Sequence, residues 1–438
     1  MKGAEPRTQN SGQAPKREFG AGKSISAGRS ANKVGPQTLP VPHSRENQPM
    51  RILIANPGST SYKCKLYDVD DMAVLFQATV ERIGDKNGIY SFTFEDEKQN
   101  SSTLPIPDYR IAVKLTLETL TEKYPIDDVA AVGFKTVHAK GVTGCVELTD
   151  EVLKAMEEYR LLAPVHTDVY VKAIAVFKDL LPSTPLVGLF ETHFHTGIPP
   201  EAYMYGIPYE YYERHGIRKY GFHGASHRYI GMRAKELYGA TKVISCHLGG
   251  SSSVCAIKDG WSIDTSMGMS PQSGLLNATR VGDLDPYALL YIMEKENLSV
   301  KEIGTVLISR GGIYGISGTS GDFRDIEQAM AIGDTRAKLA FDTFAYYVKR
   351  YIGEYLATLN GADCIVFTGG AGQKSVLLRK TILVNMENLG IVLDDQKNQS
   401  NPSEGLISRD GSKIRIAIIP TNEEYVVAQE VRKFLEHR

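Results

Sequence analysis

The sequence predicts an α/β protein built from two related halves. Short apolar segments alternate with longer amphipathic segments along most of the chain, which is typical of strands followed by helices. A short motif that begins at residue 55 recurs at residue 246. Two halves that open with the same motif indicate a duplicated domain.

The strands and helices are expected from Arg51 onward. Apolar runs bounded by turn residues predict strands at 52–56, 63–68, 130–134, 186–190, 242–246, 253–258, 364–368 and 414–419. Amphipathic periodicity predicts helices at 109–123, 150–161, 167–181, 224–238, 285–296, 299–309, 324–332, 335–359, 375–389 and 422–436.

The repeated motif reads ANPGSTSYKCKLYD at 55–68 and CHLGGSSSVCAIKD at 246–259. Each copy has an apolar strand, a turn of small residues and a second strand, so each predicts a β-hairpin. Backbone N–H groups and hydroxyls in such turns bind anions, and two turns that face a common cleft would hold a polyphosphate. Two unrelated hairpins are the alternative interpretation. Neither turn has the spacing of a Walker A loop.

The composition is that of a globular protein without a strongly charged surface. Of the 438 residues, 42% are hydrophobic and 23% are charged, and the formal net charge is −1. This balance argues against nucleic acid or an anionic membrane as a partner. The five cysteines form no C-x-x-C pair, which fits a reducing cytoplasm.

Residues 1–49 differ from the rest of the chain. They are rich in Gly, Ser, Pro and charged residues and contain few large apolar ones, so they predict a disordered tail. Met50 directly precedes the first strand, so a start of the protein at this methionine is one interpretation of the tail. A basic docking arm or a transit peptide is the other.

Two polar segments place charged or titratable side chains next to predicted strands. In GFHGASHRYI, His223 and His227 have the i, i+4 spacing of a metal-binding pair. Gly224 suits a helix start instead, which leaves His223 in the loop and gives His227 a structural role. The segment 264–286 has little periodicity, and its Arg280 would neutralise a transferring phosphoryl group or pair with Asp283.

Three further segments suggest a binding site. FTGGAGQKS at 367–375 reads as a strand, a glycine-rich turn and a helix, a general nucleotide-binding arrangement. In IPTNEEYVV, Glu423 lies in the first turn of a helix, where the helix dipole favours an acid and where Mg²⁺ would also be held. Glu191 follows a strand, at the sheet edge where catalytic groups gather. A zinc site of Glu191, His193 and His195 is the alternative.

Together these motifs resemble those of the acetate kinase (acetokinase) family, within the actin, sugar kinase and Hsp70 superfold. The resemblance extends from about residue 51 to the end of the chain and rests on NPGSTSYKCKLYD, FETHFH, YGFHGASHRY, CHLGGSSSVCAI, DTSMG, TRVGDLDP, SGDFRD, FTGGAGQ and IPTNEE. That superfold pairs two RNase H-like (actin-like ATPase) domains around a nucleotide cleft. The resemblance implies an N-terminal domain of 50–198 plus 421–438 and a C-terminal nucleotide-binding domain of 199–420.

The resemblance also implies an activity: reversible transfer of a phosphoryl group from ATP to acetate, giving acetyl phosphate and ADP. It assigns catalysis to Glu191, His223 and Arg280. The implied acid-binding residues are Lys135, Val137, Val165, Phe222 and Pro271. The implied ATP-binding residues are Lys63, His247, Leu248, Gly249, Gly250, Ser251, Asp322, Phe323, Arg324, Gly370, Ala371, Gly372, Gln373 and Lys374. Asn56 and Glu423 are the implied residues for Mg²⁺, with Mn²⁺ as the alternative, and a cytoplasmic homodimer is expected.

Four positions depart from the family pattern. Glu191 stands where the family has an aspartate, Lys135 stands where it has an arginine, and Gly250 and Lys374 replace asparagines. Because lysine cannot grip a carboxylate with two parallel hydrogen bonds, we expect the longer Glu191 to compensate for Lys135. Three alternatives stay open: propionate or butyrate as the acid, pyrophosphate as the phosphoryl donor, and an actin-like nucleotide-sensing module with little activity.

Overall fold

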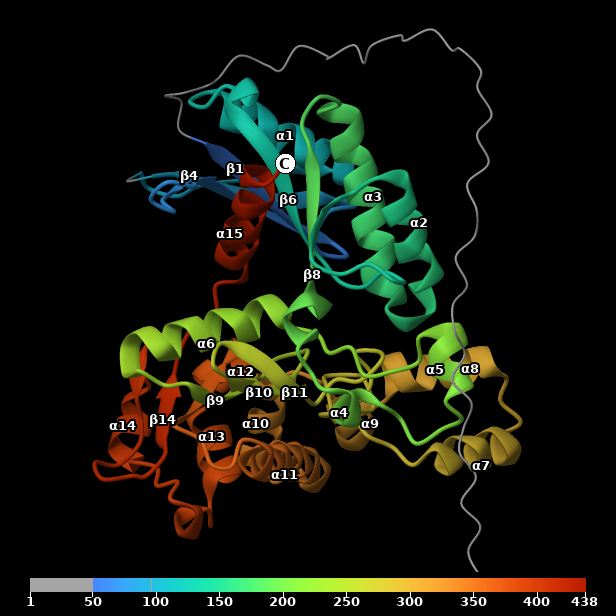
Figure 1. Cartoon of the computed structure of the whole chain (residues 1–438), viewed down its shortest axis with the longest axis vertical. Helices are drawn as coiled ribbons and strands as arrows, with labels where there is room; N and C mark the ends of the chain where they lie inside the picture. Colours follow the sequence, from blue (N-terminus) through green and yellow to red (C-terminus); the bar gives the residue numbers. More distant parts are fainter. Residues whose placement is uncertain (1–49, 96) are drawn as a thin grey trace, which may run out of the picture. The chain divides into compact units, whose positions relative to one another are not determined.

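The computed structural model describes residues 50–95 and 97–438, which form two β-sheets covered by helices (Figure 1). The predicted disordered tail, 1–49, lies outside the described residues. No helix in the described part of the chain combines the length and the apolar character needed to cross a membrane.

The first sheet has eight strands in the order β5-β4-β3-β2-β1-β6-β8-β7. Their bounds are β1 Arg51–Pro57, β2 Ser61–Asp68, β3 Val74–Glu81, β4 Asp85–Phe94, β5 Asn100–Ile106, β6 Val129–Thr136, β7 Cys145–Glu147 and β8 Leu186–Phe190.

The second sheet has six strands in the order β11-β10-β9-β12-β14-β13. Their bounds are β9 Lys242–His247, β10 Ser253–Lys258, β11 Trp261–Thr265, β12 Cys364–Thr368, β13 Gly405–Leu406 and β14 Arg415–Ile418.

The two sheets share one five-stranded topology. In the first sheet β1 pairs antiparallel with β2, which pairs antiparallel with β3, while β1, β6 and β8 run parallel. In the second sheet β9 pairs antiparallel with β10, which pairs antiparallel with β11, while β9, β12 and β14 run parallel. The predicted duplication is therefore confirmed, and the interpretation as two unrelated hairpins is wrong.

Fifteen α-helices occur among the described residues. Their bounds are α1 Tyr109–Thr121, α2 Asp150–Glu158, α3 Pro164–Leu180, α4 Pro200–Tyr203, α5 Glu210–His215, α6 Gly224–Tyr238, α7 Pro286–Glu296, α8 Val300–Thr305, α9 Gly312–Ser317, α10 Phe323–Ala331, α11 Thr335–Thr358, α12 Gly369–Lys374, α13 Val376–Leu383, α14 Asp395–Ser400 and α15 Glu423–Glu436.

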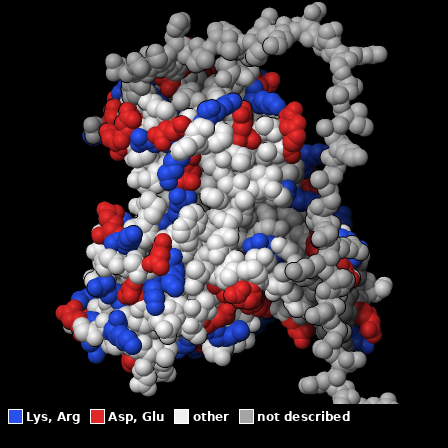
Figure 2. All heavy atoms as spheres, in the orientation of Figure 1, with Lys and Arg blue, Asp and Glu red and all other residues white. Residues whose placement is uncertain are grey.

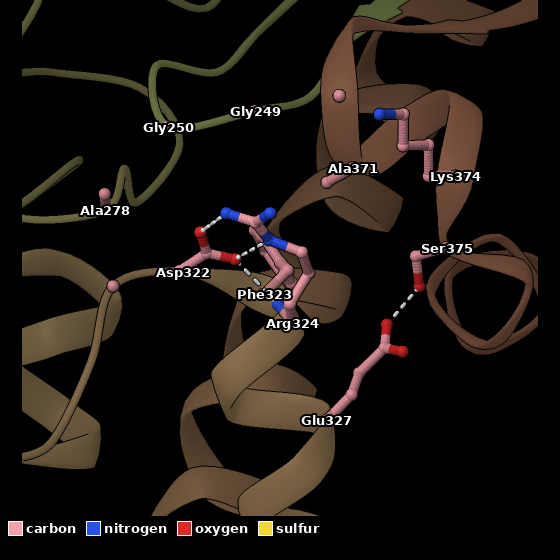
Figure 3. Close-up of a pocket in the computed structure, with 12 residues that line it drawn as sticks. Gly249, Gly250, Ala278, Asp322, Phe323, Arg324, Glu327, Ala371, Lys374 and Ser375 are labelled. Carbon is pink, nitrogen blue, oxygen red and sulfur yellow. Dashed lines mark hydrogen bonds and ion pairs between the residues drawn. The ribbon is translucent and has the colours of Figure 1, made fainter.

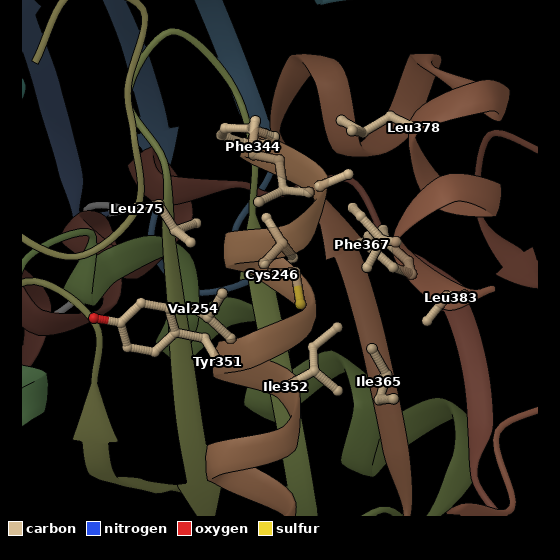
Figure 4. Packing of buried hydrophobic residues seen from close by; sticks show 14 of the residues in the cluster. Cys246, Val254, Leu275, Phe344, Tyr351, Ile352, Ile365, Phe367, Leu378 and Leu383 are labelled. Atoms are coloured by element: carbon tan, nitrogen blue, oxygen red, sulfur yellow. The ribbon is translucent and has the colours of Figure 1, made fainter. Parts of the chain in front are cut away.

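Helices cover both faces of each sheet, so the central strands are buried on both sides and read as continuous apolar runs. Along β1, Leu53 and Ala55 pack into the core beneath α1 and α3, whereas Ile52 and Ile54 face α15. In the second sheet the long helix α11 packs on one face, where Phe344 and Ile352 meet β9, β10 and β12 (Figure 4). Helix α6 covers the opposite face. The predicted division into domains stays a prediction.

Several short elements were not expected, among them β7, β11, β13 and α14, and two further regions also differ. The strands β3 to β5 were not predicted, and of these β5 is a mostly exposed, polar edge strand with little apolar alternation. The helix expected at 375–389 begins as predicted, where Ser375 accepts a hydrogen bond from the Leu378 N–H and caps α13, but it ends at Leu383. The glycine-rich segment before it, expected as a turn, forms the short helix α12.

Charged side chains of both signs are interspersed on the face shown in Figure 2. This mixture agrees with the net charge of −1.

Candidate active site

His223 occupies a strained loop position directly before helix α6. Its φ of 57° and ψ of 28° lie in the left-handed region, which residues other than glycine rarely adopt and which is concentrated at functional sites. The prediction that α6 begins at Gly224 is confirmed. A Cβ at Gly224 would lie 1.9 Å from the Glu191 backbone oxygen, so glycine is needed for α6 to approach the end of β8. This approach lets the His223 N–H donate to Glu191 Oε2 at 3.4 Å.

His223 and Glu191 line a cavity of about 310 Å³, here called the central cavity. The turn of each repeated hairpin contributes to its wall, which confirms the expectation that both turns border one cleft. The first turn contributes Asn56, Pro57, Gly58 and Ser59, and the second contributes His247 and Ser251. The remaining wall residues are Lys135, Val137, His166, Val169, Tyr170, Phe222, Pro271 and Glu423.

Lys135 lies between two glutamates in this cavity. Its Nζ is 2.8 Å from Glu423 Oε2 and 3.4 Å from Glu191 Oε1. Burial alone would lower the pKa of Lys135, but the two carboxylates outweigh it and raise the pKa well above its usual value. Burial raises the pKa of Glu191, whereas at Glu423 burial is outweighed by the charge of Lys135, which lowers the pKa. Two carboxylates therefore share one ammonium group.

Asn56 and Glu423 have the donor atoms of a magnesium site. Glu423 Oε1 is buried without a hydrogen-bond partner, and such an acceptor is costly unless a cation or water completes it. Asn56 Oδ1 accepts only a long hydrogen bond of 3.3 Å from the Tyr170 hydroxyl. Carboxylate and amide oxygens suit Mg²⁺ and Mn²⁺, and Mg²⁺ commonly takes water and phosphate oxygens as its other ligands. These residues thus fit a divalent cation.

The alternative zinc site is not formed. Among residues 50–95 and 97–438 no three His, Cys, Asp or Glu side chains gather in a metal-binding group. Both ring nitrogens of His195 are engaged, Nδ1 with the Ser262 hydroxyl at 2.8 Å and Nε2 with the Phe222 carbonyl at 2.9 Å. His195 is therefore a structural residue that supports the Phe222 backbone.

Arg280 reaches the second hairpin turn from the long loop between β11 and α7. It donates hydrogen bonds to the Ser251 hydroxyl and, at 3.2 Å, to Asn277 Oδ1. The alternative role as a partner of Asp283 is wrong, because Asp283 accepts from the Gly274 N–H at 2.8 Å and the Tyr351 hydroxyl at 2.5 Å. Within the described part of the chain, Arg280 thus has no carboxylate partner at hydrogen-bond distance. Burial lowers its pKa to about 10, so it remains a cation at neutral pH.

His223 is neutral in the substrate-free protein. Burial, reinforced by the neighbouring His247 and His227 rings, lowers its pKa well below 6.5. Its ring stacks on His247 with centroids 4.3 Å apart, and Nδ1 contacts the Ser253 hydroxyl at 2.8 Å. His223 therefore offers the central cavity a hydrogen bond and not a full positive charge. His227 is fully buried beneath it, in agreement with a structural role.

The acid-binding residues implied by the resemblance form one wall. Val137, Phe222 and Pro271 line the central cavity beside Val169 and Tyr170, and Lys135 lies at the same wall. Val165 lies near the start of α3, and its side chain is outside the described part of the chain. A small apolar surface next to a single cation suits a short carboxylic acid.

A second cavity, of about 470 Å³, is lined mainly by glycines and by polar residues, and is here called the glycine-lined cavity (Figure 3). Asp322 and Arg324 form a two-bond ion pair at its edge, which lowers the pKa of Asp322 to about 2. Glu327 accepts a hydrogen bond from Ser375 on the other side. The residues around it are Gly249, Gly250, Ala278, Gly321, Asp322, Phe323, Arg324, Glu327, Gly370, Ala371, Lys374 and Ser375. Most of the implied ATP-binding residues are thus brought together here.

The other implied ATP-binding residues lie elsewhere. His247 and Ser251 line the central cavity. Leu248 is a core residue whose carbonyl accepts from the Ala371 and Gly372 N–H groups, which anchors α12 to the second turn. Gly372 and Gln373 border neither cavity, although their carbonyls accept from the buried Arg379. Lys63 is exposed on β2 and borders neither cavity.

The sequence reasoning missed several site residues, among them Tyr170, His166 and Glu424. Tyr170 and His166 come from the first turns of α3, and Glu424 accepts a hydrogen bond of 3.3 Å from Asn56. The aromatic and titratable side chains in PVHTDVY were a signal, since they interrupt an otherwise apolar helix face on consecutive turns.

Comparison with known proteins identifies the family of the chain. The model of the acetokinase family matches residues 51–429. An acetate kinase from Carboxydothermus hydrogenoformans is 42% identical over 399 residues, which cover 89% of this chain and 100% of that protein.

Solved structures give the same result. The chain is similar to the crystal structure of an acetate kinase from Porphyromonas gingivalis, with 37% identity, a TM-score of 0.78 and coverage of 88% of this chain and 99% of that one. It is also similar to a propionate kinase from Francisella tularensis, with 35% identity, a TM-score of 0.80 and coverage of 87% and 98%. Its two sheets have the duplicated actin-like ATPase fold, and the chain belongs to the acetokinase family.

Proposed function

We propose that this protein is an acetate kinase, which transfers the γ-phosphoryl group of ATP to acetate and yields acetyl phosphate and ADP reversibly. The observation that carries the proposal is the central cavity. It joins a cation, an apolar wall, a buried carboxylate and the turns of both hairpins in about 310 Å³. The adjoining hairpin turn at 249–250 also borders the glycine-lined cavity, where the nucleotide would lie.

Acetate would be held through its two ends. Its methyl group would contact Val137, Phe222 and Pro271, and its carboxylate would approach Lys135. Since acetate is already ionised at neutral pH, Glu191 has little need to remove a proton and serves mainly to orient the acid and Lys135. One carboxylate oxygen of acetate then forms a bond to the γ-phosphorus as the bond from that phosphorus to the bridging oxygen of ADP breaks.

The charge on the transferring phosphoryl group would be balanced by this chain's own donors. Arg280 contributes a cation held on Ser251, and His223 contributes a hydrogen bond from a neutral ring. Preorganised donors of this kind account for most of the catalysis in phosphoryl transfer.

The proposal includes a divalent cation, Mg²⁺ or Mn²⁺, held by Asn56 and Glu423. It would neutralise phosphate oxygens of the nucleotide. Its support is the unpartnered Glu423 Oε1 and the presence of a single ammonium group between the carboxylates of Glu191 and Glu423.

Propionate is the second acid to be tested. The similar structure from Francisella tularensis is a propionate kinase, and the wall of the central cavity is formed by side chains whose size decides which acyl chain fits. Butyrate belongs to the same test. Pyrophosphate would replace ATP only if Gly250 and Lys374, which both border the glycine-lined cavity, made that cavity unsuitable for a nucleotide.

The test is a hydroxamate assay on the purified full chain, with acetate, propionate and butyrate each combined with Mg-ATP and with pyrophosphate. The proposal predicts the highest kcat/KM for acetate with ATP. Higher values for a longer acid, or turnover only with pyrophosphate, would reassign the substrate. Binding of ATP without turnover of any pair would favour a nucleotide-sensing module instead.

The proposal extends to a cytoplasmic homodimer. The five cysteines are all free, as in a reducing compartment. Helix α7 exposes Tyr287, Leu290 and Tyr291, whose exposed fractions of 78%, 58% and 63% are large for neighbouring apolar side chains and suit contact with a second copy. Sedimentation of the purified wild type and of the Tyr291→Lys variant tests this proposal, which predicts a dimer for the wild type and a weakened dimer for the variant.

A further inference from the structure

A chain of four buried side chains leads from the interior to the central cavity. The Ser245 hydroxyl contacts His227 Nδ1 at 2.9 Å, His227 Nε2 contacts the Ser253 hydroxyl at 2.7 Å, and the same hydroxyl contacts His223 Nδ1 at 2.8 Å. All four residues are buried, and only His223 lines the cavity. These four residues are here called the Ser–His chain.

The Ser253 hydroxyl links the protonation of the two rings. It has a single hydrogen, so it donates to one ring nitrogen and accepts from the other. Both rings are neutral because burial lowers both pKa values well below 6.5, and a neutral imidazole carries one N–H and one acceptor nitrogen. The proton positions of His223 and His227 are therefore coupled.

Two arrangements satisfy this coupling. In the first, Ser245 donates to His227 Nδ1, His227 Nε2–H donates to Ser253, and Ser253 donates to His223 Nδ1, which leaves the His223 proton on Nε2. In the second, every donor is reversed, so His227 Nδ1–H donates to Ser245 and the hydrogen of Ser245 needs another acceptor. Ser245 is fully buried and makes no other side-chain hydrogen bond within the described residues. The first arrangement leaves no buried hydroxyl hydrogen unpaired, so it is favoured.

We propose that Ser253, held by His227, is a positioning residue that keeps the His223 proton on Nε2, where it donates a hydrogen bond into the central cavity. The catalytic part of this inference rests on the proposed function: the acceptor would be an oxygen of the transferring phosphoryl group. The left-handed backbone of His223 fixes the start of its side chain, and the contact of Ser253 with Nδ1 fixes the rotation of the ring. Together they direct the Nε2–H of a neutral His223 ring into the central cavity.

The chain offers a matched control. Ser262 makes the same kind of contact with a buried histidine, to His195 Nδ1 at 2.8 Å, but neither side chain lines the central cavity. Ser253→Ala and Ser262→Ala therefore each remove a serine hydroxyl from a buried contact with a histidine Nδ1. Ser253→Thr keeps a hydroxyl and serves as the rescue variant.

The experiment is a long-range ¹H–¹⁵N correlation spectrum of the substrate-free full chain labelled in histidine, followed by steady-state kinetics. In the wild type, we expect His223 and His227 to carry protons on Nε2, with His223 Nδ1 shifted as a hydrogen-bond acceptor. Ser253→Ala should move the Nδ1 resonance of His223 toward that of an unbonded nitrogen and lower kcat about 10- to 100-fold, with little change in the KM for ATP. Ser253→Thr should restore both, and Ser262→Ala should change neither.

A wild-type His223 protonated on Nδ1 would overturn the proposal, and this result does not depend on whether any variant folds. An unchanged His223 Nδ1 resonance in folded Ser253→Ala would also overturn it. The spectra are recorded without substrates, so they test the proton position of His223 independently of activity. Absence of kinase activity in the wild type would refute the proposed function but not the inference about His223.

Discussion

The ammonium group of Lys135 lies 3.4 Å from the carboxylate of Glu191, and both side chains line the central cavity. The resemblance to the acetokinase pattern places departures at these two positions, and the two side chains are in direct contact. This contact could explain the expected compensation. The ammonium group of lysine cannot form the two parallel hydrogen bonds of a guanidinium, and glutamate is long enough to reach it. The expectation itself stays a prediction.

A double-mutant cycle tests the compensation. Lys135→Arg and Glu191→Asp should each lower kcat/KM for acetate about 10-fold, because each alone mismatches the pair, whereas the double variant should return to within about 3-fold of the wild type. The measurement is steady-state kinetics at varied acetate. A double variant whose loss equals the product of the single losses would show that the two positions act independently.

Removal of the Glu423 carboxylate should weaken binding of the divalent cation. Glu423→Gln keeps the shape of the side chain but removes a charge, so we expect the concentration of Mg²⁺ at half-maximal activity to rise about 10-fold or more. Calorimetric titration of Mg-ADP gives a second readout that needs no turnover.

Glu430→Gln is the control for this prediction. Glu430 is buried on the same helix α15 but pairs with Arg228 at 2.8 Å, and it lines neither cavity. Its loss should lower stability and leave the Mg²⁺ requirement unchanged. An equal effect of the two substitutions on Mg²⁺ would argue against a metal role for Glu423.

Enlarging the apolar wall should shift the preferred acid. Val137→Ala removes two methyl groups from the central cavity, and each methylene in an apolar pocket changes discrimination by about 1–3 kcal/mol. The ratio of kcat/KM for butyrate to that for acetate should therefore rise about 10-fold. Val132→Ala, in the buried core of β6 and away from the cavity, should leave the ratio unchanged. An unchanged ratio in Val137→Ala would remove Val137 from the acid-binding wall.

His138 should make the protein less stable in mild acid. It is buried among Tyr159, Tyr220 and Phe222 with neither ring nitrogen hydrogen-bonded, and burial lowers its pKa from 6.5 to about 3. Below pH 6.5 the unfolded chain binds a proton at this histidine that the folded chain does not. Its contribution to the free energy of unfolding is therefore full above pH 6.5 and falls by about 1.4 kcal/mol for each pH unit below it.

His138→Phe keeps an aromatic ring in this cluster and removes the titrating group. Urea unfolding of both proteins between pH 5 and pH 7 should show the steeper loss of stability in the wild type, since the other groups titrate alike in both. Identical slopes would mean that His138 is protonated in the folded protein or is exposed to water.

Local sequence patterns were sufficient for the repeated hairpins and for the loop position of His223. Apolar runs ended by small polar residues identify β1, β2, β9 and β10, and the glycine after His223 marks the start of α6. These features depend on residues that are neighbours along the chain, so one sequence is enough to predict them.

The electrostatics of the site could not be predicted in the same way. Lys135 and Glu423 are 288 positions apart in the sequence and meet only because α15 returns to pack on β1 and β6. The failed pairing of Arg280 with Asp283 shows the opposite error, since residues close in sequence are separated by the path of a loop. The edge strand β5 was missed because its polar side chains carry little signal of pairing.

The most direct test of the central claim is a ³¹P NMR time course of the purified full chain with Mg-ATP and acetate. The proposed function predicts that the acetyl phosphate resonance grows at the rate at which ADP forms, and that ADP with acetyl phosphate regenerates ATP. Formation of ADP and inorganic phosphate without acetyl phosphate, or an unchanged ATP spectrum, would contradict it.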